Sequence, residues 1–174
     1  MSSNMVTMSF VSTGTTSGSV INSQLIAQHG SGGTHVVTGP VAATLVGGNG
    51  NDQLIGGAGD NQIFGGLGAD TLTGGGGVNH FVYAAAAESP VAGGDVITDF
   101  NPLADRLVFE GLLHGTFAFL GAAGFTGLGN SEAWFDDATK LLSVDLDGNG
   151  TAEMGITLAG AILANLAPSD FLWT

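Results

Sequence analysis

A nine-residue unit repeats four times without a break in the middle of the chain. The units are GGNGNDQLI (47–55), GGAGDNQIF (56–64), GGLGADTLT (65–73) and GGGGVNHFV (74–82). Repeats of a short fixed period build solenoids, because each unit can bury its apolar face only against its neighbours. Position eight of each unit is apolar and holds Leu54, Ile63, Leu72 and Phe81. We expect these side chains to point from short strands into the interior of a solenoid.

The glycine and polar positions of the repeat indicate a metal site. Glycine at positions two and four permits positive φ angles and brings main-chain carbonyls close to an ion. A carboxylate or amide at position six supplies the hard oxygen ligand that calcium prefers, so we expect several bound Ca2+ ions. A glycine-rich coil without metal is the alternative, although its stacked carboxylates would repel one another. The candidate ligands are Gly48, Gly50, Asp52, Gly57, Gly59, Asn61, Gly66, Gly68, Asp70, Gly75, Gly77 and Asn79.

The period predicts that the two edges of the solenoid differ. With two units per coil, residues 18 apart in the sequence stack, which places Asp52 over Asp70 and Asn61 over Asn79. Asp60 stands one place too early to be an ordinary ligand. Calcium affinity rises with the charge of the ligands, so we expect the Asp52/Asp70 edge to bind more tightly.

The same register extends upstream with fewer polar ligands. Residues 38–46 (TGPVAATLV) keep Gly39 and Leu45 in place, and residues 29–37 (HGSGGTHVV) keep Gly30, Gly32 and Val36. Position six holds Ala43 in the first and Thr34 in the second. We interpret both segments as degenerate coils that extend the core, with a Gly/Ser/Thr-rich loop as the alternative.

The charge balance favours cations as partners. Fifteen acidic residues stand against two basic ones, Arg106 and Lys140, which gives a formal net charge of −13. Such a chain is not expected to bind nucleic acid or anionic membranes. It has no cysteine, no apolar run long enough to span a bilayer, and no basic and apolar start typical of a cleaved signal peptide. Without disulfides, metal binding is a recognised source of stability.

Residues after the repeats carry a family resemblance. They include FVY at 81–83, the D-x-I-x-D-F stretch at 95–100, DRLVF at 105–109 and a closing SDFLW at 169–173. Residues from about 45 to 174 thus resemble the C-terminal region of RTX (hemolysin-type) calcium-binding proteins, most closely that of serralysin-type metalloproteases. The resemblance implies a parallel β-roll continuing into a C-terminal antiparallel β-sandwich. It also implies that Asp95 and Asp99 complete the calcium sites of the last coil, with strand-end capping as the alternative.

The resemblance further implies a route of export. Members of the family leave the cell through type I secretion machinery, made of an ABC transporter, an adaptor and an outer-membrane channel. An uncleaved C-terminal signal directs them, and the missing N-terminal signal fits that route. We therefore expect a secreted protein, extracellular or at the cell surface, without membrane insertion.

The C-terminal half reads as all-β. Short apolar runs at 81–83, 96–100, 106–109, 116–120, 133–135, 141–146 and 154–158 alternate with Gly, Asp and Asn clusters. Residues 145–153 resemble the first nine positions of an EF-hand loop, but Ile156 stands where a bidentate glutamate is needed. We favour a β-hairpin with its turn at 147–150, and a weak calcium site there stays open. Residues 160–167 fit either a short helix or a last strand.

Catalytic motifs are absent from the sequence. No H-E-x-x-H and no G-x-S-x-G occurs, and the four histidines, at 29, 35, 80 and 114, lack the spacing of a zinc site. The protease activity implied by the resemblance therefore does not transfer, and we expect no enzyme.

The organisation follows from these features. Residues 1–28 form an N-terminal cap or flexible leader, in which Val6, Met8 and Phe10 suggest one strand; residues 29–82 form the β-roll, with 29–46 degenerate; and residues 83–174 form the sandwich with the secretion signal. We expect a secreted, non-catalytic protein whose repeats fold on binding extracellular Ca2+. Two alternatives stay open: a structural or adhesive protein that self-associates through its solenoid ends, and a C-terminal fragment of a larger serralysin-like enzyme.

Overall fold

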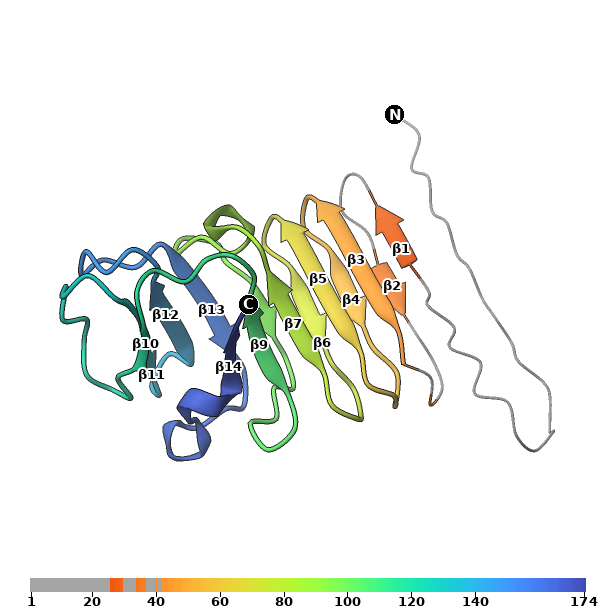
Figure 1. The fold of residues 1–174 in the computed structure, drawn as a ribbon. Coiled ribbons are helices and arrows are strands. Elements are labelled where there is room, and N and C mark those ends of the chain that lie inside the picture. Colours follow the sequence, from red (N-terminus) through yellow and green to blue (C-terminus); the bar gives the residue numbers. More distant parts are fainter. Residues whose placement is uncertain (1–25, 30–33, 37–39, 41) are drawn as a thin grey trace, which may run out of the picture.

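The computed structural model describes residues 26–29, 34–36, 40 and 42–174, which form an elongated roll of two β-sheets (Figure 1). The six-stranded sheet has the order β1 (Ile26–His29), β3 (Thr44–Asn49), β5 (Gln62–Leu67), β7 (His80–Tyr83), β9 (Arg106–Phe109) and β14 (Phe171–Trp173). The eight-stranded sheet has the order β10 (Phe117–Phe119), β11 (Ser131–Asp136), β12 (Leu141–Asp145), β13 (Met154–Leu158), β8 (Val96–Ile97), β6 (Thr71–Thr73), β4 (Gln53–Ile55) and β2 (Thr34–Val36). The described part of the chain also contains three short 3-10 helices, at Ala86–Glu88, Leu163–Asn165 and Pro168–Asp170. The predicted all-β fold with a parallel β-roll is confirmed.

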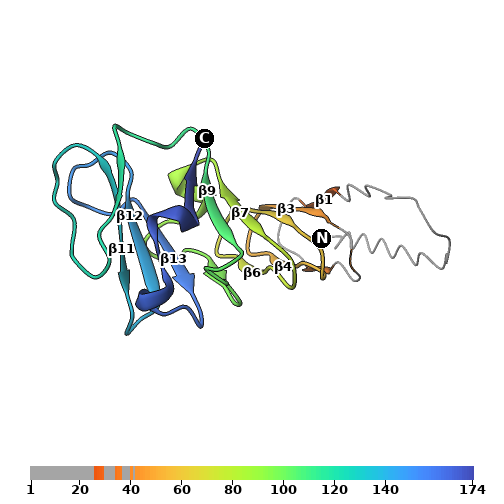
Figure 2. The same ribbon diagram turned by 60° about the horizontal axis from the view of Figure 1, so that its bottom comes forward.

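Successive strands from β1 to β9 alternate between the two sheets, so each pair of repeats makes one coil (Figure 2). The coils stack in parallel with an offset of 18 residues, as in the pairs Leu45↔Ile63 and Leu54↔Leu72. All four position-eight residues are at most 1% exposed, as the period predicts. Burying a large aliphatic or aromatic side chain contributes roughly 1.5–3 kcal/mol, so this row of side chains holds the sheets together.

The first coils agree with the sequence register only in part. Thr44 pairs with Gln62 and Ala43 is buried, so residues 43–46, the end of the unit at 38–46, keep the predicted register. The register predicted for 29–37 is wrong, because Thr34 pairs with Gln53 and takes position seven instead of six. Thr34 follows Ile26 by eight residues, whereas their partners Gln53 and Thr44 lie nine apart, and the β1/β3 pairing is irregular between Ala27 and His29. The strand predicted around Val6, Met8 and Phe10 lies outside the described residues.

The roll continues beyond the repeats with longer connections. Val96 of β8 pairs with Thr71, and Arg106 of β9 pairs with His80, at offsets of 25 and 26 residues. The additional residues lie in the loops that follow β7 and β8, and the first of these contains the 3-10 helix Ala86–Glu88. The buried Ser89 ties this loop to β13, because it accepts a hydrogen bond from Asp95 N and donates one to Gly155 O, both 2.8 Å long.

The C-terminal part extends the same two sheets. β13 joins β8 in parallel and β14 joins β9 in parallel. Within the described residues, antiparallel pairing joins β11 to β12 and β12 to β13, and one isolated antiparallel bridge joins Pro90 to Met154. The expected continuation of the roll into a C-terminal antiparallel β-sandwich is therefore not confirmed. Aromatic rings of β9, β10 and β14 pack together at this end: Phe109 stacks on Trp173 with a centroid distance of 4.6 Å, and Phe117 lies tilted against Trp173 at 4.8 Å. Residues 160–167 contain a 3-10 turn, and no helix in the described ranges is long and apolar enough to cross a membrane.

Candidate metal sites along the edges of the roll

Three buried carboxylates stack at one edge of the roll, and we call Asp52, Asp70 and Asp95 the aspartate column. The Asp52 backbone N–H donates a 2.7 Å hydrogen bond to Asp70 Oδ1, and the Asp70 N–H donates a 2.9 Å bond to Asp95 Oδ1. None of the three residues is more than 3% exposed. The predicted stacking of Asp52 over Asp70 is confirmed, and Asp95 adds a third level.

The remaining carboxylate oxygens of the aspartate column lack partners. Both oxygens of Asp52 and the Oδ2 atoms of Asp70 and Asp95 are buried without a hydrogen bond. Buried charges are normally paired or bound to a metal, because their desolvation is costly. The chain has only two Lys/Arg residues, and both pair elsewhere: Arg106 lies 3.9 Å from Asp170, and Lys140 lies 2.7 Å from Asp137.

Burial disfavours the charged forms of two of these carboxylates, Asp70 and Asp95, in the absence of a cation. Burial raises the pKa of Asp70 to about 6, and the neighbouring Asp52 charge adds to that rise. Burial likewise raises the pKa of Asp95 to about 7, with a further contribution from Asp70. The hydrogen bonds from Asp52 N and Asp70 N oppose these shifts without cancelling them. The Tyr83 hydroxyl also acts to lower the pKa of Asp95, although Tyr83 Oη and Asp95 Oδ2 do not reach hydrogen-bonding geometry.

The glycine loops bring main-chain oxygens to the same place. A Cβ atom on Gly47 would lie 2.3 Å from the Gly65 carbonyl oxygen and 2.6 Å from Asp52 Oδ2. The missing side chain thus leaves a cradle in which a carbonyl and an unpartnered carboxylate oxygen meet. Six glycines of the turns have positive φ angles, a conformation that residues with a side chain rarely adopt and that lets successive turns lie close together. They are Gly48, Gly50, Gly66, Gly68, Gly75 and Gly77. Hard, anionic and carbonyl oxygens fit a calcium ion.

The opposite edge carries a different stack, and we call Asn61, Asn79 and Asp105 the asparagine column. Asn61 Nδ2 donates to Asn79 Oδ1 at 2.9 Å, to Gly59 O at 2.7 Å and to Gly74 O at 3.1 Å. Asn79 Nδ2 donates to Asp105 Oδ1 at 3.1 Å. The backbone N–H groups of Asn61 and Asn79 donate along the same column, to Asn79 Oδ1 at 3.1 Å and to Asp105 Oδ1 at 2.9 Å. The predicted stacking of Asn61 over Asn79 is confirmed.

Two aspartates beyond the repeats, Asp99 and Asp105, differ in their positions relative to the two columns, and the repeat period does not predict this difference. Asp99 lies outside both columns and accepts 2.8 Å hydrogen bonds from the N–H groups of Gly74 and Gly75. Asp105 was missed as a site residue, because an offset of 26 residues hides it from an 18-residue period. Its place directly before the strand at 106–109 is the signal that could have found it, since position six of each repeat also precedes a strand.

The position-five residues form a further set of contacts outside the columns. Asp60 Oδ1 accepts a 2.7 Å hydrogen bond from Val78 N, and Asn51 Oδ1 accepts a 3.0 Å bond from Ala69 N. Both side chains are exposed. Asp60 is therefore a link between coils at the surface. On the asparagine edge, the carbonyl oxygen of Gly57, a predicted ligand, accepts a 2.9 Å hydrogen bond from Gly76 N of the next coil.

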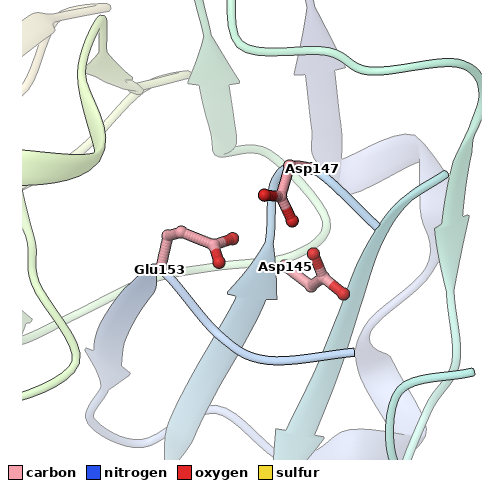
Figure 3. Close-up of side chains that lie close together, drawn as sticks. All are labelled: Asp145, Asp147 and Glu153. Carbon is pink, nitrogen blue, oxygen red and sulfur yellow. The ribbon is translucent and has the colours of Figure 1, made fainter. Parts of the chain in front are cut away.

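A second acidic cluster lies between β12 and β13. The predicted antiparallel hairpin is confirmed, but residues 146–153 connect its strands, a longer loop than the predicted turn at 147–150. Carboxylate oxygens of Asp145, Asp147 and Glu153 lie within 4.8 Å of one another (Figure 3). These carboxylates are already hydrogen bonded: Asp145 accepts from Gly148 N at 2.7 Å and Gly150 N at 2.6 Å, and Glu153 accepts from Leu146 N at 2.7 Å. The loop is thus held by its own acidic side chains.

Comparison with known proteins agrees with this architecture. A parallel β-roll with stacked position-six side chains defines an RTX-type repeat module. The family model described as peptidase M10 serralysin C terminal matches residues 30–172, and the chain belongs to this family. No curated protein sequence matches the chain.

Solved structures with this fold include modules of a larger enzyme. The chain is similar to the AlgE6R3 subunit of the Azotobacter vinelandii mannuronan C5-epimerase, with 26% identity, a TM-score of 0.52, and coverage of 88% of this chain and 81% of that one. The AlgE6R2 subunit of the same enzyme shows 24% identity and a TM-score of 0.53, with coverage of 88% and 94% respectively. The second likeness concerns the fold alone.

Proposed function

We propose that this module binds calcium along the aspartate column and that binding drives its folding. The observation that carries the proposal is the set of buried, unpartnered oxygens on Asp52, Asp70 and Asp95. With no Lys or Arg at the column, its charge needs a cation from solution. A bound calcium ion would supply positive charge and accept several oxygen ligands at once.

Different oxygens of the aspartate column have different roles. The Oδ1 atoms of Asp70 and Asp95 tie successive coils together through backbone N–H groups. Their Oδ2 atoms, both oxygens of Asp52 and the carbonyl of Gly65 remain for the ion. The carboxylates come from coils 18 and 25 residues apart, so the site exists only when the coils are stacked, and binding free energy becomes folding free energy.

The same coupling supports a role in export. Where calcium is scarce, repulsion between the carboxylates and the flexibility of the glycines favour an open chain that can pass a type I secretion channel. Outside the cell, calcium would close the roll. We propose on this basis a secreted module without catalytic activity of its own.

A calcium titration followed by circular dichroism tests the proposal. We expect β-sheet signal to rise between excess chelator and millimolar calcium, and magnesium at the same concentration to have a much smaller effect, because it demands a stricter octahedral geometry. The double variant Asp52→Asn/Asp70→Asn should weaken the response, whereas Asp136→Asn/Asp137→Asn, at the end of β11 and in the exposed turn that follows it, should leave it unchanged. An identical spectrum of the wild type with and without calcium would overturn the proposal.

A second candidate is that the module serves a larger enzyme. Its family is named for the C-terminal part of peptidases, and both similar structures are named as subunits of an epimerase. The reading frame around the coding sequence tests this candidate: a catalytic domain in the same frame supports it, and stop codons on both sides contradict it.

A further inference from the structure

We infer that the side-chain amides of Asn61 and Asn79 replace metal ions on the second edge of the roll, so that this edge closes without calcium. The inference differs from the sequence-based expectation, which placed both residues among the calcium ligands. It depends on the contacts of the asparagine column and holds whether or not the aspartate column binds calcium.

The two edges place different atoms at equivalent points. At Gly47, the position of a missing Cβ lies 2.3 Å from Gly65 O and 2.6 Å from Asp52 Oδ2. At Gly56, the equivalent position lies 2.3 Å from Gly74 O and 2.8 Å from Asn61 Nδ2. Gly65 O and Gly74 O thus occupy equivalent positions, but the first lies near a carboxylate oxygen and the second lies near an amide nitrogen.

This exchange of one atom changes what holds the coils together. Two oxygen atoms repel unless a cation lies between them, whereas an N–H group donates to the facing carbonyl. Asn61 Nδ2 lies within 3.1 Å of three oxygens, those of Gly59, Gly74 and the Asn79 side chain. These oxygens belong to two successive coils and converge as ligands converge on an ion, but the point is occupied by a donor.

Asn79 makes similar contacts one coil further on, and Asp105 ends the column. Asn79 Nδ2 donates to Asp105 Oδ1 and, at 3.3 Å, to Gly76 O, while Asp105 Oδ2 accepts a 2.9 Å bond from Asn101 N. Both oxygens of Asp105 are thus partnered, in contrast to the aspartate column. Stacked asparagine amides of this kind stabilise parallel β-stacks. Of the side-chain amide atoms of Asn61 and Asn79, only Asn61 Oδ1 is buried without a partner, and it is neutral.

Exchanging the two side-chain types tests the inference. Asn61→Asp puts a carboxylate among three oxygens and should make this edge dependent on calcium. Asp52→Asn puts an amide beside Gly65 O. The first level of the aspartate column should then no longer need calcium. Asn51→Asp is the matched control, because it adds the same charge at position five, where Asp60 already makes the same contact on the opposite edge.

Two measurements on the full chain separate the outcomes. Equilibrium dialysis should show at least one further bound calcium ion per chain in Asn61→Asp, a loss of at least one in Asp52→Asn, and no change in Asn51→Asp. Circular dichroism in chelator, with the same amount of a stabilising osmolyte throughout, should show the folded fraction decreasing from Asp52→Asn to wild type to Asn61→Asp.

The inference is overturned if Asn61→Asp binds no more calcium than wild type and is as folded in chelator. It is also overturned if Asp52→Asn is less folded in chelator than wild type, a result that does not depend on whether Asn61→Asp folds. Absence of any calcium binding by the wild type would contradict the proposed function alone, because the order of folded fractions in chelator would still test the asparagine column.

Discussion

The backbone N–H of Asp52 donates a 2.7 Å hydrogen bond to Oδ1 of Asp70, which lies 18 residues further along the chain. The same bond joins Asp70 to Asp95, although 25 residues separate them. Each carboxylate therefore uses one oxygen to hold the coil before it, which leaves Oδ2 of both Asp70 and Asp95 buried and unpartnered. Asp70 and Asp95 thus each have one structural oxygen and one oxygen free to bind an ion.

Asp70→Asn should weaken calcium binding while preserving the link between coils. The amide oxygen can still accept from Asp52 N, but the middle of the column loses its charge. We expect the calcium affinity measured by calorimetry to fall at least about tenfold, equivalent to about 1.4 kcal/mol. Asp60→Asn is the control, because Asp60 is exposed and only accepts from Val78 N. Equal losses in the two variants would show that overall charge matters more than the column.

The calcium-free protein should become less stable as the pH rises from about 4 to 7. The pKa values of Asp70 and Asp95, about 6 and 7, lie above the ordinary value of 3.8, so the folded state binds more protons than the unfolded state in this window. Stability from these groups is present at low pH and is lost as they ionise. Circular dichroism in chelator with a fixed amount of a stabilising osmolyte, at a series of pH values, measures the folded fraction, and Asp70→Asn/Asp95→Asn should flatten its dependence on pH. Greater stability at pH 7 than at pH 5 would argue against the shifts.

Gly47→Ala should destabilise the roll for a steric reason. The new Cβ would lie 2.3 Å from Gly65 O, a main-chain atom that cannot move without shifting the next coil. We expect a loss of about 1–3 kcal/mol or more in the free energy of unfolding, measured by urea titration in calcium. Gly124→Ala is the matched control, because no heavy atom lies within 4 Å of its Cβ position and its φ angle is not left-handed. A similar loss of unfolding free energy in Gly47→Ala and Gly124→Ala would contradict the steric reason, because it would indicate that glycine replacement acts through the unfolded state.

The β12–β13 loop should depend on Asp145 more than on Asp147, with or without calcium. Asp145 is fully buried and accepts hydrogen bonds from Gly148 N and Gly150 N, whereas Asp147 is exposed. Asp145→Ala leaves these donors without their acceptor and should lower the free energy of unfolding by about 1–3 kcal/mol. Asp147→Asn should change it by less than about 0.5 kcal/mol. A large effect of Asp147→Asn seen only in calcium would instead reveal an ion in this loop.

The repeat period predicted the part of the fold in which every coil has the same length. Residues 18 apart must stack there, so the positions of Leu54 and Leu72, and of Asp52 and Asp70, followed from the sequence. The prediction failed where coil lengths change. One residue fewer within β1, between Ala27 and His29, moved Thr34 to position seven, and longer loops brought Asp105 to the end of the asparagine column.

The chemical difference between the edges was only partly predictable. Sequence alone distinguishes a charged edge from an amide edge, but it does not reveal that Asn61 Nδ2 meets three oxygen atoms. That contact depends on how closely the coils approach, which the glycines at positions 56 and 74 permit. The direction of β13 and β14 was also not predictable, because their partners β8 and β9 lie far away in the sequence.

Anomalous diffraction from crystals grown in calcium tests the central claim most directly. The account predicts calcium peaks beside the unpartnered oxygens of Asp52, Asp70 and Asp95, and none between Asn61 and Asn79. Calcium peaks within the asparagine column, or an aspartate column that holds no ion at saturating calcium, would contradict it.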